Sequence, residues 1–307
     1  MIRGVHGEKL VSVLNSDKLP VDEVERIEDA IKVYDDWIIE LNEADGDSVT
    51  DLIFNMVELL NEYKRFIDLD LIFDSPNDFL HRQKGQLKLD NTVTEEFLPI
   101  LAKKCIIKEF GSFNADIGAQ TQTFSSAHFA SSLSNSTIGG GMNIRTKDQD
   151  FAMSRRLYIK SSYDPEFDPN DTLNITTNIG YVLAELKTNL DKTMFQEASA
   201  TAYDVKRAVS GAKYYLLCDY LDMTPISTAT TEIDEVLILR KTRRIGSHIR
   251  RKFSTYAGRM ELRDFYVEYL DSNPYSADII TRFIEHIFSQ VIDEELIEES
   301  ILDVGYF

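Results

Sequence analysis

The 307-residue chain has little of what would stabilise a small secreted domain or cross a membrane. Only two cysteines occur, Cys105 and Cys218, which are too few for a disulfide framework or a cysteine-based zinc site. No apolar run approaches the roughly 20 residues of a membrane-spanning helix, and the first residues lack the apolar stretch of a signal peptide. Glycine-rich phosphate-binding patterns are also missing, so no nucleotide cofactor is indicated. We therefore expect a cytoplasmic protein that does not contact a membrane.

Positive charge is scarce at both ends of the chain, whose formal net charge is −19. Residues 1–100 carry 10 Lys or Arg against 23 Asp or Glu, and residues 255–307 carry 3 against 12. The middle, 101–254, carries 20 against 17. Affinity for DNA depends on local cationic contacts with phosphate and not on total charge. The acidic total therefore does not exclude a DNA partner for the middle of the chain.

A basic strip lies at 240–252. Its positive side chains are Arg240, Lys241, Arg243, Arg244, Arg250, Arg251 and Lys252. We interpret the strip as a DNA-binding segment that holds the phosphate backbone. The alternative interpretation is a solvated surface loop.

The order of predicted elements indicates an α/β fold with a mixed sheet flanked by helices. Apolar residues recur at three-to-four spacing and predict helices over 20–43, 48–66, 93–109, 193–209, 260–272 and 275–299. Apolar runs predict strands over 151–160, 179–187, 213–219 and 235–240.

Two polar segments and the charge distribution complete this organisation. The Ser-, Thr- and Gly-rich segment 121–141 and the Pro-containing segment 163–178 are predicted to be loops. The first is either a flexible surface loop or, extended to 145, a segment that reads DNA bases. We divide the chain into a helical N-terminal region (1–110), a core (111–254) and an acidic helical C-terminal region (255–307).

The candidate catalytic and metal-binding residues lie at the end of the strand predicted over 179–187. Side chains alternate along a strand, so Glu185 and Lys187 project to the same side. With Asp150 from a neighbouring strand, they form a set that can bind Mg²⁺ through carboxylate oxygens and position a water. The Leu186 carbonyl, between Glu185 and Lys187, could add a backbone ligand. Lys187 would orient or deprotonate the attacking water, or stabilise developing charge.

Two alternatives remain open from the residues alone. Glu-x-Lys is a common pattern, and a salt bridge on an exposed strand is its usual explanation. Asp164, Asp168 and Asp171 lie closer in sequence to Glu185 than Asp150 does. We favour Asp150 as the first acid because it begins a strand, whereas the other three lie in a predicted loop.

Three segments in this order resemble a known enzyme family. They are Lys147-Asp148-Gln149-Asp150-Phe151, Ala184-Glu185-Leu186-Lys187, and Thr231-Glu232-Ile233-Asp234-Glu235 before the strand that ends at Leu239-Arg240. Together they resemble type II restriction endonucleases of the PD-(D/E)XK superfamily, and most of all the BbvCI-like group. The resemblance covers about 140–245, and Gln149 departs from it, because the superfamily often has proline there.

The resemblance implies a PD-(D/E)XK catalytic core with helical additions at both ends. It implies that Asp150 and Glu185 bind the metal and that Lys187 is the catalytic lysine. The expected activity is Mg²⁺-dependent hydrolysis of double-stranded DNA at a short specific sequence. A double-strand break needs two active sites, so we expect a homodimer or a heterodimer with a related subunit. The rival hypotheses are a structure-specific repair nuclease, a non-catalytic partner subunit, and an acidic interaction protein.

Overall fold

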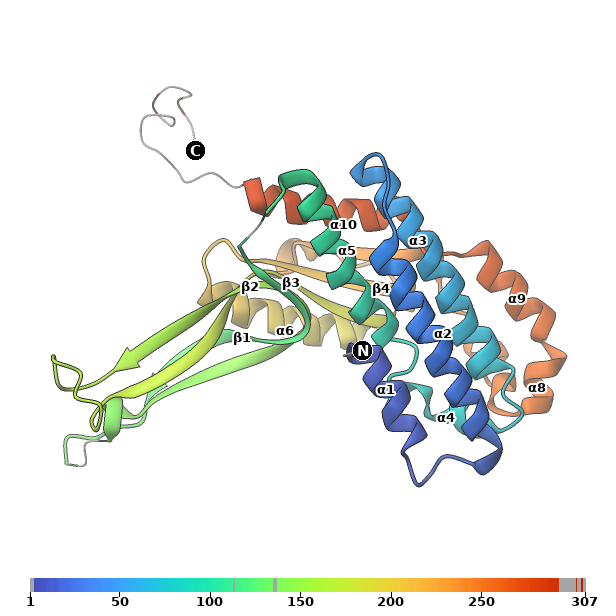
Figure 1. Cartoon of the computed structure of the whole chain (residues 1–307), viewed down its shortest axis with the longest axis horizontal. Helices are drawn as coiled ribbons and strands as arrows, with labels where there is room; N and C mark the ends of the chain where they lie inside the picture. Colours follow the sequence, from blue (N-terminus) through green and yellow to red (C-terminus); the bar gives the residue numbers. More distant parts are fainter. Residues whose placement is uncertain (1–2, 113, 135–136, 293–301, 303–304, 306–307) are drawn as a thin grey trace.

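A five-stranded mixed sheet forms the centre of the protein, which we describe from a computed structural model covering residues 3–112, 114–134, 137–292, 302 and 305 (Figure 1). The strand order is β1-β2-β3-β4-β5. Strands β1 (Asp116–Phe129), β2 (Met142–Ser161) and β3 (Leu173–Leu190) pair antiparallel. Strands β4 (Lys213–Leu221) and β5 (Glu235–Arg243) continue the sheet parallel to β3. The predicted α/β fold with a mixed sheet is confirmed.

Helices cover both faces of the sheet. Helix α6 (Lys192–Ala208) packs its small residues Ala198 and Ala202 on one face, which includes Ala152 and Leu183. The alternate strand residues, such as Phe151, belong to a second core on the other face. That core is completed by α1 (Val5–Leu14), α2 (Val24–Glu43), α3 (Val49–Arg65), α5 (Thr92–Phe110) and α10 (Ala277–Ile292).

This second core joins the two ends of the chain to the sheet. Leu60 on α3, Leu217 on β4 and Phe283 on α10 belong to one buried cluster. Helices α3 and α10 therefore share one core with the sheet. In the described part of the chain, none of the helices is long and apolar enough to span a membrane.

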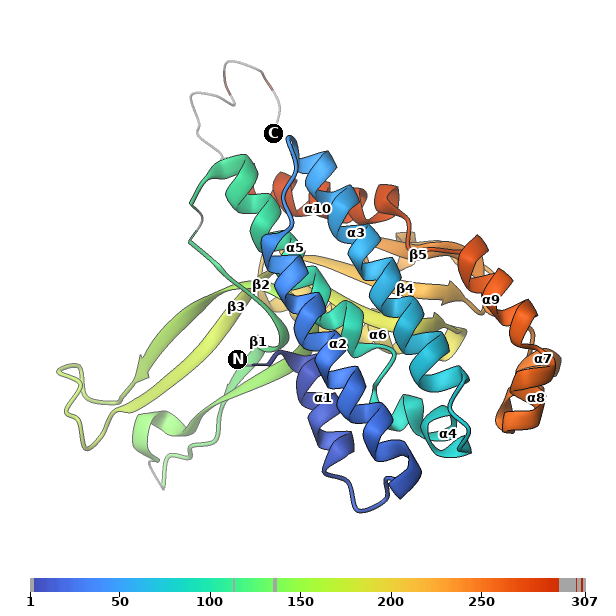
Figure 2. The same ribbon diagram turned by 45° about the vertical axis from the view of Figure 1, so that its right-hand side comes forward.

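The remaining helices lie at the end of the sheet where β4 and β5 finish (Figure 2). After α3 the chain continues as a π-helix (Phe66–Phe73) and then α4 (Asp78–Leu87). The segment after β5 adds α7 (Ser247–Arg250), α8 (Tyr256–Glu261) and α9 (Arg263–Ser272). Arg259 joins the two regions: its fully buried guanidinium donates to the carbonyls of Phe73 and Ser75 at 2.8 and 2.9 Å. Helix α4 is thereby fixed beside the end of the sheet.

Several predicted helices are confirmed, and the capping residues explain where they begin. Ser48 and Asp51 form a capping box at the start of α3: the Ser48 hydroxyl accepts from the Asp51 N–H, and the Asp51 carboxylate accepts from the Ser48 N–H. Asp191 caps α6 by accepting from the Met194 N–H at 2.9 Å. Helices α1 and α4 have no counterpart in the sequence prediction. The predicted helix 275–299 is observed as far as Ile292, and its last part lies outside the described residues.

The prediction of a loop over 121–141 is wrong for 121–129, whereas the described residues from 130 to 141 do connect β1 and β2 as a loop. Residues up to Phe129 belong to β1 and pair with β2, which itself begins at Met142 and not at 151. Two hairpins, β1–β2 and β2–β3, extend together away from the helices and form an arm (left in Figures 1 and 2). Much of the arm is exposed, so hydrogen bonds between backbones hold its strands together. These strands therefore lack the alternation of apolar and polar residues by which a half-buried strand is predicted.

The tips of the two hairpins touch, and glycines make this contact possible. The Ser161 hydroxyl donates to the Gly139 carbonyl at 2.8 Å. Gly139 has a positive φ of 61°, and a Cβ there would lie 2.4 Å from the Cβ of Leu173. The loop predicted over 163–178 is shorter than expected, because β3 already begins at Leu173.

Candidate active site

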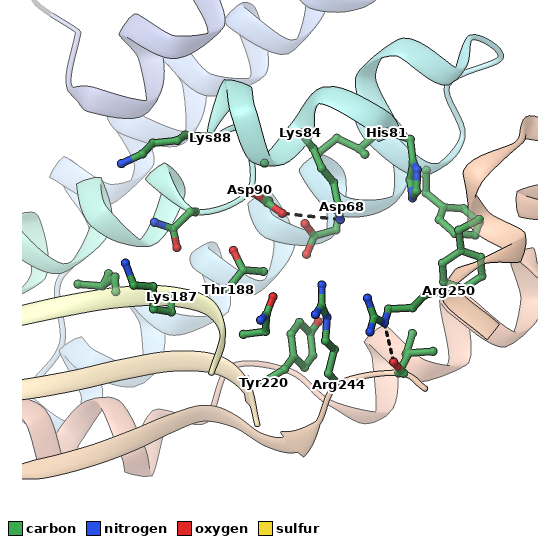
Figure 3. A pocket seen from close by; sticks show the side chains of 18 of the residues that line it. Asp68, His81, Lys84, Lys88, Asp90, Lys187, Thr188, Tyr220, Arg244 and Arg250 are labelled. Atoms are coloured by element: carbon green, nitrogen blue, oxygen red, sulfur yellow. Dashed lines mark hydrogen bonds and ion pairs between the residues drawn. The ribbon is translucent and has the colours of Figure 1, made fainter. Parts of the chain in front are cut away.

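A cavity of about 570 Å³ lies between helix α4 and the ends of β3, β4 and β5 (Figure 3). One wall comes from α4 and the turn after it, with His81, Lys84 and Lys88. The opposite wall comes from the strand ends and α7, with Lys187, Arg244 and Arg250. Asp150, Glu185 and Leu186 also line the cavity. The structure therefore brings the three residues of the predicted catalytic set into one cavity.

Pairing between β2 and β3 positions this set. Phe151 lies opposite Ala184, which places Asp150 next to Glu185 across the two strands. The Leu186 N–H donates to Asp150 Oδ2 at 2.8 Å and fixes that carboxylate against β3. Lys187 Nζ lies 2.5 Å from Glu185 Oε1. Both side chains of this ion pair are partly accessible, with 28% and 21% of their surface exposed.

The two carboxylates are held in an environment that opposes their ionisation. Burial, together with the charge of Glu95 on α5, raises the pKa of Asp150 above its usual value. Burial and the neighbouring Asp150 raise the pKa of Glu185. Burial alone would lower the pKa of Lys187, but the adjacent Glu185 reverses this effect and the pKa is raised. The site thus concentrates negative charge that a cation would stabilise.

The donor atoms fit a hard divalent cation. Asp150 and Glu185 supply carboxylate oxygens, which Mg²⁺ prefers together with waters. In an extended strand the N–H and C=O of one residue point to the same side. The Leu186 carbonyl therefore faces the side on which Asp150 accepts from the Leu186 N–H. No group of three or more His, Cys, Asp or Glu side chains in the described ranges is arranged to hold a metal, so waters or phosphate oxygens would complete the shell.

The rival acids lie elsewhere. Asp164, Asp168 and Asp171 are in the turn between β2 and β3, beyond the pair Ser161–Leu173. At about 3.4 Å per residue, that end of the hairpin is roughly 35 Å from Asp150. Asp164 instead accepts from the N–H groups of Glu166 and Asp168 within the turn. Among the four candidates, only Asp150 is near Glu185.

The basic strip 240–252 is not one surface. Arg244 and Arg250 line the cavity, and Arg244 pairs with Asp222 at 2.9 Å. Lys241 pairs with Asp278 on α10, and Lys252 with Glu261 on α8. Arg243 and Arg251 are exposed.

Arg240 is the exception within the strip, because its side chain points into the protein. It is 3% exposed, donates to the Asn273 carbonyl at 2.7 Å, and lies 3.4 Å from Asp68. Its guanidinium stacks 4.1 Å from the centre of the Tyr275 ring. Inclusion of Arg240 in the DNA-binding set is therefore corrected: the residue neutralises buried carboxylates and cannot reach a phosphate.

Sequence analysis missed the wall of the cavity that α4 provides. The described residues of this wall include two lysines and a histidine, and Lys84 pairs with the buried Asp90 at 3.7 Å. Burial, with the nearby charges of Lys84 and Arg259, lowers the pKa of His81 to about 4, so this ring is neutral. The segment carries no recognisable motif. Only its polarity beside an apolar stretch distinguishes it in the sequence.

Comparison with known proteins identifies the family. Residues 86–307 match the family model of the Bpu10I restriction endonuclease. A solved structure, the native BbvCI A2B2 tetramer, has a similar fold: the TM-score is 0.60 at 16% identity, over 97% of this chain and 100% of that chain. No curated protein matches this chain. The family match covers most of the chain, and the chain therefore belongs to the Bpu10I restriction endonuclease family of type II DNA endonucleases.

Proposed function

We propose that this chain hydrolyses phosphodiester bonds of double-stranded DNA at a specific sequence, using Mg²⁺ held by Asp150 and Glu185. The observation that carries the proposal is the convergence of Asp150, Glu185 and Lys187 in one cavity. Membership of a restriction endonuclease family supplies the substrate class. The donor set fits the metal, with the Leu186 carbonyl as a further ligand.

The chain's own residues have distinct roles in this proposal. Asp150 and Glu185 hold the metal, which when bound acidifies water and offsets charge on the phosphate. Lys187 contacts Glu185 and therefore lies beside the proposed metal site. Its ammonium orients the attacking water or stabilises the developing negative charge. Water attacks phosphorus directly, and no covalent enzyme intermediate is needed.

Cations around the cavity would hold the DNA backbone. Arg244 and Arg250 lie within the cavity and would contact phosphates next to the scissile one. Arg243, Arg251, Lys241 and Lys252 are exposed on the same segment and would extend this contact. The segment 121–145 belongs largely to the arm, whose Ser and Thr side chains would contact bases or phosphates.

We further propose that the active assembly contains a second catalytic subunit. One cavity cuts one strand, so a double-strand break needs two. The similar fold in the BbvCI A2B2 tetramer supports pairing of this chain with another copy or with a related subunit.

Digestion of supercoiled plasmid tests the proposal. The purified chain is incubated with Mg²⁺, with EDTA in a parallel reaction, and the variant Asp150→Ala is compared with Asp164→Ala. Asp164 is a matched control, because it is an acid of the same hairpin at the opposite end. We expect Mg²⁺-dependent cleavage by the wild type and by Asp164→Ala, and none by Asp150→Ala.

The products also report on the assembly. Linear fragments of discrete size would show that the chain alone cuts both strands. Nicked circles would show that it cuts one strand and needs a partner. If the protein is folded and binds DNA but does not cleave it with any of the divalent metals tested, the chain is a non-catalytic subunit and the proposal fails.

A further inference from the structure

Lys88 is a second lysine at the catalytic end of the cavity, and neither the family motifs nor the sequence analysis assigns it a role. It lies at the end of α4, across the cavity from Lys187 (Figure 3). Its positive charge acts on both Asp150 and Glu185, although burial dominates the pKa of each carboxyl group. Lysines from opposite walls therefore line the same cavity as this pair of acids.

The backbone of Lys88 is held in a conformation that disfavours lysine. Its φ of 53° and ψ of 30° are left-handed, a geometry that glycine or asparagine adopts more easily at the end of a helix. Hydrogen bonds on both sides fix this turn: Leu89 N–H donates to the Lys84 carbonyl at 3.1 Å. The Thr92 hydroxyl donates to the Lys88 carbonyl at 2.7 Å. A strained residue that its surroundings hold in place is typical of a functional position.

Pairing with Glu95 does not account for the lysine. Lys88 Nζ lies 4.0 Å from Glu95 Oε1, at the outer limit of an ion pair, and the Lys88 side chain is 49% exposed. Glu95 already accepts from Asn91 Nδ2 at 2.5 Å and from Gln120 Nε2 at 3.1 Å. The Lys88 side chain is thus half exposed and is not committed to the Glu95 carboxylate.

We propose that Lys88 binds a non-bridging oxygen of the scissile phosphate or of the phosphate next to it, from the wall opposite Lys187. This inference rests on the proposed nuclease function and adds to it a positioning residue from outside the three motifs. A phosphodiester placed against Asp150 and Glu185 meets strong like-charge repulsion. Cations on both sides of the phosphate offset that repulsion and fix its orientation.

The left-handed backbone makes a sharp test possible, because stability and activity should respond in opposite directions. Lys88→Asn and Lys88→Gly relieve the backbone conformation and remove the charge, whereas Lys88→Arg keeps the charge. We expect both neutral variants to melt at or above the wild-type temperature. Their single-turnover cleavage of a plasmid that the wild type cuts should fall on the order of 100-fold. Lys88→Arg should recover most of this loss.

A second readout does not depend on cleavage. Binding of a 30-base-pair duplex in Ca²⁺ is measured over a series of salt concentrations. Loss of one phosphate contact should reduce the slope of log K against log salt by about 1 for Lys88→Asn. Lys32→Gln, an exposed lysine on α2 whose Nζ pairs with Asp29, is the matched control and should match the wild type in both assays.

The outcomes separate this inference from the proposed function. If Lys88→Asn and Lys88→Gly cleave within twofold of the wild type, or if their salt slope is unchanged, Lys88 does not contact phosphate and the inference is overturned. If the wild type cleaves no DNA, the proposed function fails, and the salt slope still decides whether Lys88 binds phosphate. A fall in cleavage together with a smaller slope supports the inference.

Discussion

Two arginines four residues apart in the basic strip should have opposite roles. Arg240 is buried, and its guanidinium lies near the carboxylates of Asp68 and Asp219. The variant Arg240→Met keeps an unbranched side chain but removes the guanidinium, and it leaves Lys64 as the principal cation for these two buried acids. Removing one partner of a buried ion pair costs about 3–5 kcal/mol. That is a large part of a net stability of roughly 5–15 kcal/mol.

The matched change is Arg244→Met. The Arg244 side chain is 31% exposed and pairs with Asp222 at a partly solvated position, so its loss should cost about 1 kcal/mol or less. Because Arg244 lines the cavity, its loss should instead weaken DNA binding and reduce the salt slope by about 1.

Two measurements distinguish these roles. Thermal unfolding followed by circular dichroism should show a midpoint lowered by about 5–8 °C for Arg240→Met and little change for Arg244→Met. Fluorescence anisotropy with a labelled duplex in Ca²⁺, well below the melting temperature, should show the reverse order of effects. The reasoning would be refuted if Arg240→Met melted like the wild type and lost a phosphate contact.

Three further predictions concern stability. Burial and Glu95 raise the pKa of Asp150, so folding favours its protonated form and this stabilisation is lost as pH rises through the folded pKa. Asp150→Asn should therefore melt higher than the wild type at pH 7.5, and by the proposed function it should not cleave DNA. Burial raises the pKa of Asp219 to about 6. Asp219→Asn should consequently gain stability over the wild type at pH 8 and lose that gain by pH 4, as paired melting curves would show. Ser48→Ala removes the capping box of α3 and should cost about 1 kcal/mol in urea unfolding; no change would show that this helix end is fixed by tertiary packing alone.

The apolar pattern of the sequence predicted the elements that the core buries. Helices α2, α3 and α6 follow this rule with one buried face, and the strands around Leu183 and Leu217 follow it with two. The arm does not, because a mostly exposed hairpin needs no apolar pattern. Its Ser- and Thr-rich strand β1 was therefore predicted as a loop.

The candidate site shows the same division. Alternation along one strand was enough to place Glu185 and Lys187 on one side. Asp150 lies beside Glu185 because β2 pairs with β3, and the spacing of residues in the sequence does not predict which strands pair. Lys84 and Lys88 reach the cavity only through tertiary packing of α4, and Arg240 turns inward although Lys241 beside it is exposed. A run of like charges in sequence does not specify which of its members share a surface.

The pairing of β2 with β3 also sets the relative position of the proposed catalytic residues. Its pairs run from Ser161 opposite Leu173 to Phe151 opposite Ala184, with one irregularity between Met153 and Ser154. A slip of one residue anywhere along these strands would turn side chains to the opposite face and separate Asp150 from Glu185. Insertions and deletions in the arm must therefore come in matched pairs, one in each strand, or be absorbed by a bulge. The length of the arm can vary during evolution, but only in steps that keep this alignment.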